Sequence, residues 1–182
     1  MTRVATVLGG LVMVAALGQG VRDLAVGIDE WSTMGPRRPG TEVPEFRVVE
    51  LEGGELGPAA LQERVSVITF WATWCPACRE ELGDLEQIDE AYAARDVQLI
   101  AVNHEGQGLS RAEATEVARA FTRQRGTELR VAIDDGSMVR AFGVGPIPHT
   151  VVCDRRGTIR FVHQGRVSAS TLREEIDELL AE

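Results

Sequence analysis

A stretch that passes from strand-forming residues through two cysteines into a helix is the feature that most constrains this chain. Residues 65–71 are mostly β-branched or aromatic, which is typical of a central strand covered on both faces. The motif Cys75-Pro76-Ala77-Cys78 begins four positions later. Pro76 suits the first position of a helix, because its missing N–H would have no intrahelical partner there. The stretch therefore predicts a buried strand that leads into a dithiol at the start of a helix.

Two cysteines with this spacing at a helix N-terminus can close a small disulfide ring. Cys75 would lie where free backbone N–H groups and the positive end of the helix dipole stabilise a thiolate. Cys78, one turn further along, would lie beneath Cys75 and be shielded from solvent. We therefore expect a redox-active disulfide that needs no bound cofactor, in which Cys75 attacks or is attacked and Cys78 resolves the mixed disulfide.

The same spacing also occurs as half of a structural zinc site, which needs four ligands. The other residues that could supply ligands are Cys153, His104, His149 and His163. None of them belongs to a second paired motif. We therefore favour redox chemistry over a metal site.

The first residues have the composition of a targeting segment. A basic start, Met1-Thr2-Arg3, precedes an uncharged and largely apolar run over residues 4–18. This run is shorter than the roughly 20 residues that a membrane-spanning helix needs. We expect residues 1–20 to be a cleaved signal peptide or an N-terminal membrane anchor, a soluble helix being the third interpretation. Any membrane association would be made by residues 4–21.

Residues 21–41 are irregular and contain Gly35-Pro36-Arg37-Arg38-Pro39-Gly40, which is typical of a linker. Residues 42–182 then form the expected folded domain. Either export interpretation places this domain outside the cytoplasm, in the periplasm or on the outer face of the cytoplasmic membrane, secreted or membrane-anchored.

Charge and cysteine count exclude some classes of partner. The chain has 19 Lys and Arg against 28 Asp and Glu, a formal net charge of −9. An acidic domain binds polyanions poorly, so we expect no nucleic-acid partner. Three cysteines leave one odd thiol, which must be hidden or reactive in an oxidising compartment. Cys153 lies in an apolar run, so we expect it to be buried and inert.

Hydrophobic periodicity predicts alternating strands and helices. A strand over residues 46–51 and a two-glycine turn predict an opening hairpin. In the helix after Cys75, an apolar stripe is expected opposite an acidic face. The stripe comprises Leu82, Leu85, Ile88 and Tyr92, and the acidic face comprises Glu80, Glu81, Asp84 and Glu90. A second buried strand over residues 97–102 implies a right-handed parallel crossover.

The C-terminal half continues the pattern. We expect a helix over residues 111–125, a strand over 129–133 and a short helix over 136–142. A proline-bearing loop then enters a hairpin whose turn centres on Arg155-Arg156-Gly157. Ser170 is expected to cap the last helix.

On these residues the chain resembles the exported TlpA/ResA/CcmG branch of thioredoxin-fold thiol–disulfide oxidoreductases. The resemblance is carried by the run from Phe70 to Leu82, by the leading hairpin and by the stretch from Gly143 through Pro148 to Gly157. It implies an α/β thioredoxin-like fold, with a central mixed sheet and helices on both faces. It also implies an N-terminal β-hairpin extension and an inserted helix and strand between residues 103 and 133.

The resemblance also implies an activity, partners and a substrate-facing wall. The expected enzyme is a protein-disulfide reductase that acts on protein thiols or disulfides outside the cytoplasm, including those of cytochrome c maturation. A membrane electron donor or acceptor would restore its dithiol. In this fold the proline before the next-to-last strand is cis and faces the dithiol, and by position that proline is Pro148. The backbone of Ile147 would then face an incoming substrate strand.

Three positions depart from this family, and one of them is Cys153, where the family normally has an aliphatic residue. Thioredoxins place a buried Asp in the strand before the dithiol, where this chain has Thr69, so the proton role of that Asp is missing or has moved. The branch carries an acid at the end of the next strand, and Glu105 is the candidate here, unless it is a solvated loop residue. His149 replaces the usual Thr or Glu after the cis-proline, and its ring either lies near the dithiol or points to another surface.

The expected substrate-binding residues surround the dithiol. They are Trp74, Pro76, Ala77, Ile147 and His149, with Trp74 on an exposed rim. An alternative from a different class is a copper-binding chaperone in which Cys75, Cys78 and His149 hold a soft ion such as Cu(I).

Overall fold

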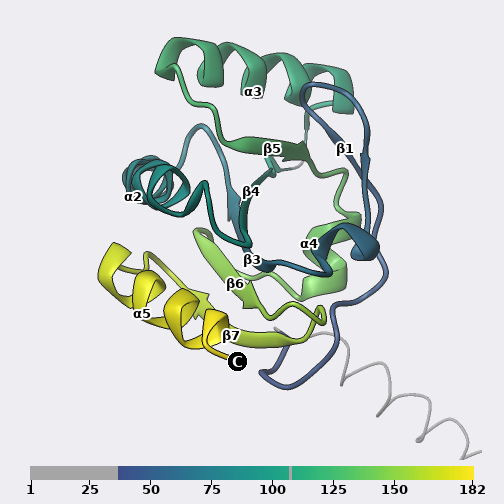
Figure 1. The fold of residues 1–182 in the computed structure, drawn as a ribbon. Helices are drawn as coiled ribbons and strands as arrows, with labels where there is room; N and C mark the ends of the chain where they lie inside the picture. Colours follow the sequence, from purple (N-terminus) through teal and green to yellow (C-terminus); the bar gives the residue numbers. More distant parts are fainter. Residues whose placement is uncertain (1–36, 107) are drawn as a thin grey trace, which may run out of the picture. The chain divides into compact units, whose positions relative to one another are not determined.

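A seven-stranded mixed sheet with the order β2-β1-β5-β4-β3-β6-β7 lies at the centre of the domain (Figure 1). The structure is a computed structural model that describes residues 37–106 and 108–182. The expected signal or anchor over residues 1–20, and the linker as far as residue 36, lie outside the described residues. In the described part of the chain, no helix is long and apolar enough to cross a membrane.

The three inner strands are parallel, as the strand–helix–strand order predicts. Strand β3 (Val65–Trp71) is buried along its whole length and pairs in parallel with β4 (Val97–Asn103). Strand β4 pairs in parallel with β5 (Arg130–Ile133). The connections between them contain α2 (Pro76–Tyr92) and α3 (Arg111–Arg125). The ends of β3 and β4 therefore meet at one edge of the sheet, and the two loops that leave them are neighbours.

Antiparallel hairpins close the sheet on both sides. Strands β1 (Val48–Glu50) and β2 (Glu55–Leu56) form the expected opening hairpin, and β1 also pairs with β5. On the other side, β6 (His149–Cys153) lies between β3 and β7 (Ile159–Gln164). The predicted mixed sheet, N-terminal hairpin and inserted helix and strand are all present.

Helices cover both faces of the sheet (Figure 1). One core cluster packs α2, α3 and α5 (Ala169–Leu180) against residues such as Val67, Leu99 and Val131. The other cluster packs α4 (Ser137–Phe142) and the 3-10 helix η1 (Pro58–Leu61) against Ile68 and Ile100. Neighbouring strand residues thus belong to different cores, as the period of two in a strand requires.

The start of the last helix differs from the prediction. Ser168, not Ser170, is the N-cap of α5, and its side chain accepts a hydrogen bond from the Thr171 N–H at 3.1 Å. Ser170 lies inside the first turn. The capping serine therefore stands two positions earlier than expected, within the same Ser-Ala-Ser run.

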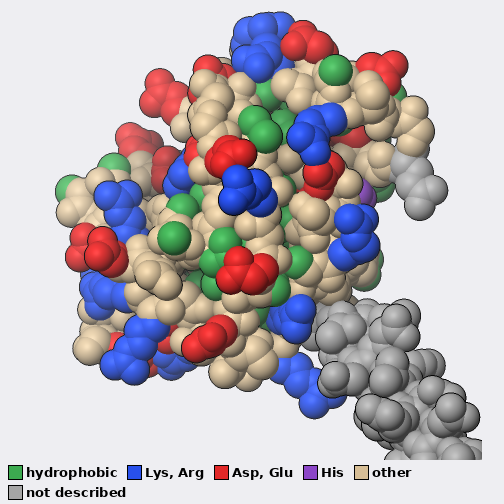
Figure 2. Space-filling view, turned by 90° about the vertical axis from the view of Figure 1, so that its right-hand side faces the viewer, with side chains coloured by type: hydrophobic (Ala, Val, Ile, Leu, Met, Phe, Trp, Pro, Cys, Tyr) green, Lys and Arg blue, Asp and Glu red, His purple; other side chains and the backbone are tan. Residues whose placement is uncertain are grey.

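The outer surface carries charges of both signs. On the face seen in Figure 2, acidic and basic side chains are interspersed, and hydrophobic side chains reach the surface of the described part in small patches. Such a face is typical of a solvated surface.

Candidate functional site

The two cysteines form a disulfide at the N-terminus of α2. Cys75 is the N-cap residue and Cys78 lies in the first turn, with 5.3 Å between their Cα atoms. Both residues are buried, at 5% and 1% exposed. The Cys78 backbone N–H points to Cys75 Sγ with a nitrogen–sulfur distance of 3.2 Å. A thiolate on Cys75 would accept this N–H at the positive end of the helix, as the sequence predicts.

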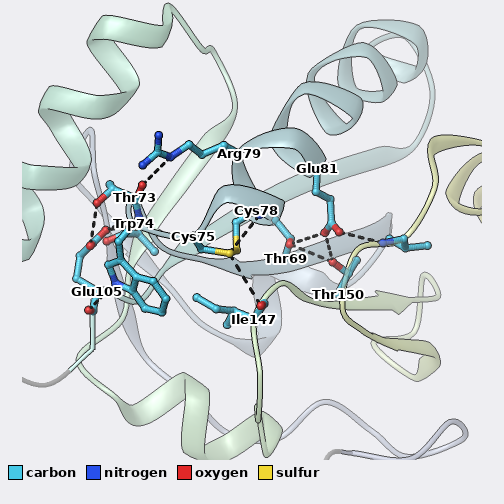
Figure 3. The surroundings of a disulfide bond; sticks show 12 residues. Thr69, Thr73, Trp74, Cys75, Cys78, Arg79, Glu81, Glu105, Ile147 and Thr150 are labelled. Atoms are coloured by element: carbon cyan, nitrogen blue, oxygen red, sulfur yellow. Dashed lines mark hydrogen bonds between the residues drawn. A yellow bond between two sulfur atoms is a disulfide. The ribbon is translucent and has the colours of Figure 1, made fainter.

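A backbone carbonyl lies on the other side of Cys75. The Ile147–Pro148 peptide bond is cis, which confirms the expected conformation. The Ile147 carbonyl oxygen lies 3.9 Å from Cys75 Sγ (Figure 3). In the disulfide this is a contact rather than a hydrogen bond, because the sulfur carries no hydrogen. Ile147 and Pro148 thus lie next to the sulfur that is expected to attack a substrate.

A buried carboxylate lies behind the dithiol. The sequence pattern predicts this residue, Glu81, on the acidic face of the helix. Glu81 is 1% exposed. Its Oε1 accepts hydrogen bonds from the Thr69 hydroxyl at 3.0 Å and the Thr150 hydroxyl at 2.6 Å, and its Oε2 accepts the Val167 N–H at 3.0 Å (Figure 3). The carboxylate therefore reaches the position on β3 where thioredoxins have their buried Asp.

The prediction that Glu81 belongs to the acidic face of α2, opposite the apolar stripe, is therefore wrong. Glu81 follows Cys78 by three positions and precedes Leu85 by four and Ile88 by seven, so helical spacing places it within the apolar stripe. Residue type led the prediction to the solvent face, whereas its position indicated the core. Glu81 and Cys78 are neighbours on one face of α2, because residues three positions apart lie about 5–6 Å apart at their Cβ atoms.

Glu105 lies at the loop before the dithiol. Its Oε1 accepts the Thr73 N–H at 2.9 Å and its Oε2 accepts the Thr73 hydroxyl at 3.0 Å. Asn103 Nδ2 also donates to Oε1 at 2.8 Å. Among the hydrogen bonds of residues 37–106 and 108–182, none joins this carboxylate to Cys75 or Cys78. The structure thus brings Glu105 to Thr73, and its expected role as an acid stays a prediction.

His149 does not lie beside the dithiol. Its neighbour Thr150 faces Glu81, so the His149 ring points to the opposite face of the sheet, where it meets Phe70 with 6.0 Å between ring centroids. The ring is fully buried, and both of its nitrogens lack a partner in the described structure. Burial, with a smaller contribution from His163, lowers its pKa from 6.5 to about 4. Neither the substrate contact nor the copper ligation expected of His149 fits this placement.

The remaining residues expected at the site form its exposed rim or the core. Trp74 is 58% exposed, and Pro76 and Ala77 are exposed beside it. Cys153 is buried in β6, and burial raises the pKa of its thiol to about 12. No cluster of three or more His, Cys, Asp or Glu side chains with metal-binding geometry occurs within the described ranges.

Comparisons with known proteins agree with this fold and site. Residues 39–162 match the model of the AhpC/TSA family. The thiol-disulfide oxidoreductase ResA of Bacillus thuringiensis (strain Al Hakam) is 31% identical over 122 residues, which cover 66% of this chain and 66% of the relative. The chain thus spans about two thirds of that relative's length.

Two further proteins extend the match over more of the chain. ResA of Halalkalibacterium halodurans is 28% identical over 144 residues, which cover 79% of this chain and 77% of that relative. The crystal structure of a thioredoxin-family thiol:disulfide interchange protein from Chlorobium tepidum TLS superposes with a TM-score of 0.66. It is 25% identical, and the match covers 80% of this chain and 99% of that one. The chain therefore belongs to the AhpC/TSA family, and within the thioredoxin fold it is similar to the ResA thiol–disulfide oxidoreductases.

Proposed function

We propose that the protein reduces disulfide bonds in protein substrates outside the cytoplasm through the Cys75–Cys78 pair. The observation that carries the proposal is the position of Cys75, between the N–H of Cys78 and the carbonyl of Ile147. The first group favours a thiolate, and the second can accept a backbone N–H of an extended substrate once the substrate lies beside the sulfur.

The proposed reaction moves two electrons from the dithiol to the substrate. The Cys75 thiolate attacks one substrate sulfur, the substrate disulfide breaks, and the other substrate sulfur leaves as a thiolate. Cys78 then loses its proton and attacks Cys75 Sγ, which breaks the mixed disulfide and releases the second substrate thiolate. The Cys75–Cys78 disulfide that remains must be reduced by an external two-electron thiol donor, which we propose is a membrane protein. No bound cofactor is needed.

Glu81 is the group that we propose accepts the Cys78 proton. It lies one turn from Cys78 on the buried side of α2, and its carboxylate is held by two hydroxyl groups and one N–H. A general base must be held within reach of the proton that it removes. Glu81 is oriented toward β3, beside the dithiol, whereas the hydrogen-bonded oxygens of Glu105 face Thr73.

The setting that we propose is the extracytoplasmic face of a cell, with cytochrome c maturation as the process. The basic and then apolar start of the chain supports export. The similarity to ResA proteins supports a reductant of protein disulfides in that setting.

A trapping experiment tests the function. Cys78→Ser should leave Cys75 joined to its substrate as a mixed disulfide that survives non-reducing gels and identifies the partner. The matched Cys75→Ser variant should trap nothing, and the wild-type protein should reduce insulin disulfides when a thiol donor is supplied. Failure of wild-type protein to reduce any protein disulfide, with no Cys75-dependent adduct, would refute the proposal.

A further inference from the structure

We infer that Glu105 is a positioning residue for the exchange reaction, because it fixes the loop that carries the chain from β3 to Cys75. This inference rests on the proposed function, since a fixed loop matters to activity only if Cys75 exchanges with a substrate. The loop comprises residues 72–74, of which Thr73 and Trp74 contact Glu105. It lies beside Glu105 because the parallel strands β3 and β4 end at the same edge of the sheet.

Three hydrogen bonds join Glu105 to the Thr73–Trp74 loop. Its two carboxylate oxygens accept the N–H and the hydroxyl of Thr73, at 2.9 and 3.0 Å. Its backbone carbonyl accepts the indole N–H of Trp74 at 3.0 Å. Figure 3 shows these contacts on the side of Cys75 opposite to Glu81. Bonds to a charged acceptor are stronger than neutral ones, so this carboxylate is a firm anchor for the loop.

The other end of Thr73 is held as well. Arg79 Nε donates to the Thr73 carbonyl at 2.8 Å, so every polar group of Thr73 has a partner. The Cys75 N–H donates to the Ala72 carbonyl at 3.2 Å. Hydrogen bonds from Glu105 on one side and Arg79 on the other therefore fix the residues before Cys75. The position of the Cys75 side chain depends on the conformation of these residues.

Trp74 gives the loop a contact surface for substrate. Trp74 is 58% exposed although its indole N–H is bonded, so it presents its aromatic face to solvent. An open groove of about 630 Å³ lies beside it. The groove is lined by Thr73, Trp74, Arg79, Phe121, Gln124 and Arg125. Glu105 thus holds in place both the residue next to the nucleophile and one wall of this groove.

Replacement of Glu105 by glutamine distinguishes positioning from acid–base chemistry. Both carboxylate oxygens of Glu105 are occupied by donors on Thr73. A glutamine at this position can keep the same contacts, because its amide oxygen can accept the two N–H groups and its NH₂ can donate to the Thr73 hydroxyl oxygen. The amide has no proton to exchange in the relevant pH range. Replacement by Gln therefore preserves a positioning role and abolishes an acid role.

The test compares Glu105→Ala with Glu105→Gln, and uses Glu128→Ala as a control on an exposed glutamate. For Glu105→Ala we expect kcat/KM for insulin reduction to fall about tenfold, mainly through KM, as loss of a positioning contact predicts. Glu105→Gln should restore kcat/KM to within about twofold of wild type. The pH profile of Cys75 alkylation in the reduced protein should keep its shape in both variants.

Fluorescence gives a readout that does not need activity. The Glu105→Ala variant keeps the backbone carbonyl that accepts the Trp74 N–H but loses both carboxylate bonds to Thr73, the residue next to Trp74. Emission of Trp74, taken as the difference from the same protein with Trp74→Phe, should therefore shift to longer wavelength and lose anisotropy in Glu105→Ala but not in Glu105→Gln, because the loop is released at Thr73. Unchanged Trp74 emission in Glu105→Ala would overturn the inference even if the protein proves to have no reductase activity. The inference would be overturned in favour of an acid role if kcat/KM fell as far in Glu105→Gln as in Glu105→Ala and the pH profile of kcat/KM lost one limb in Glu105→Gln.

Discussion

At the scale of single residues, two neighbours on β6 decide how the site is built. Thr150 donates to the buried carboxylate of Glu81, and His149 points into the opposite core against Phe70. Both residues follow Pro148 directly in the sequence, but alternation in a strand sends only Thr150 to the side of the dithiol. That choice depends on how the cis-proline loop enters the strand, which residue type alone does not specify.

The burial of His149 predicts acid sensitivity. Its pKa is about 4 in the folded protein and about 6.5 in an unfolded chain, so between these values the unfolded state binds a proton that the native state does not. The free energy of unfolding should therefore decrease as the pH falls from 6.5 toward 4. The loss attributable to this group between pH 7 and 4.5 is roughly 2–3 kcal/mol.

Denaturant unfolding of His149→Phe at the two pH values checks this expectation. The variant should show a smaller decrease in the free energy of unfolding than wild type, by about that amount. Wild-type protein measured beside the variant at both pH values supplies the reference decrease. An equal decrease in wild type and His149→Phe would contradict the assignment.

At the scale of elements, hydrophobic periodicity predicted the framework well. The bounds of β3 and α3 agree with the prediction, because β-branched composition and a Ser-x-x-Glu capping box define them locally. Helix α2 was also predicted, but the role of one side chain on it was not. A carboxylate within an apolar stripe is stable in the core only when it accepts hydrogen bonds from partners on distant strands, here Thr69 and Thr150. The sequence of the helix alone does not reveal these partners.

Replacement of Glu81 tests the role of that face of α2. Glu81→Gln should fold, because the amide can exchange hydrogen bonds with the same hydroxyl groups. The attack of Cys78 on a Cys75 mixed disulfide should become about 100-fold slower, which is the typical contribution of a general base. A preformed mixed disulfide with a dye-labelled peptide would report this step by stopped flow. The exposed neighbour supplies the control, since Glu80→Gln should leave the rate unchanged, and equal rates in both variants would count against the proposal.

At the scale of the whole molecule, the two cores separate three thiols into two classes. Cys75 and Cys78 lie at the end of the sheet beside the exposed Trp74, whereas Cys153 is enclosed in the core between the sheet and α4. The strand composition around Cys153 predicted its burial. The position of the site at one edge of the sheet followed from the parallel strand order.

A thiol titration measures this separation. After reduction and removal of the reductant under anaerobic conditions, the native protein should release two equivalents of thiolate from an aromatic disulfide reagent at pH 8, because Cys75 attacks the reagent and the buried Cys78 then closes the disulfide. A third equivalent should react only after denaturation, because burial raises the pKa of Cys153 to about 12. Cys153→Ser should give two equivalents under both conditions. Rapid reaction of three thiols in the native protein would refute the separation.

The burial of Cys153 has a consequence for the way this chain must mature. The thiol is unreactive only once β6 is paired between β3 and β7, whereas in an unfolded chain its pKa returns to about 8.5. Before the sheet forms, all three thiols are therefore reactive, although the short ring between Cys75 and Cys78 closes more readily than a long loop to Cys153. A bond from Cys153 to Cys75 or Cys78 would prevent β6 from entering the sheet. Pairing of β6 with β3 and β7 thus removes Cys153 from thiol–disulfide exchange and leaves the Cys75–Cys78 pair as the only one that the folded domain can form among residues 37–106 and 108–182.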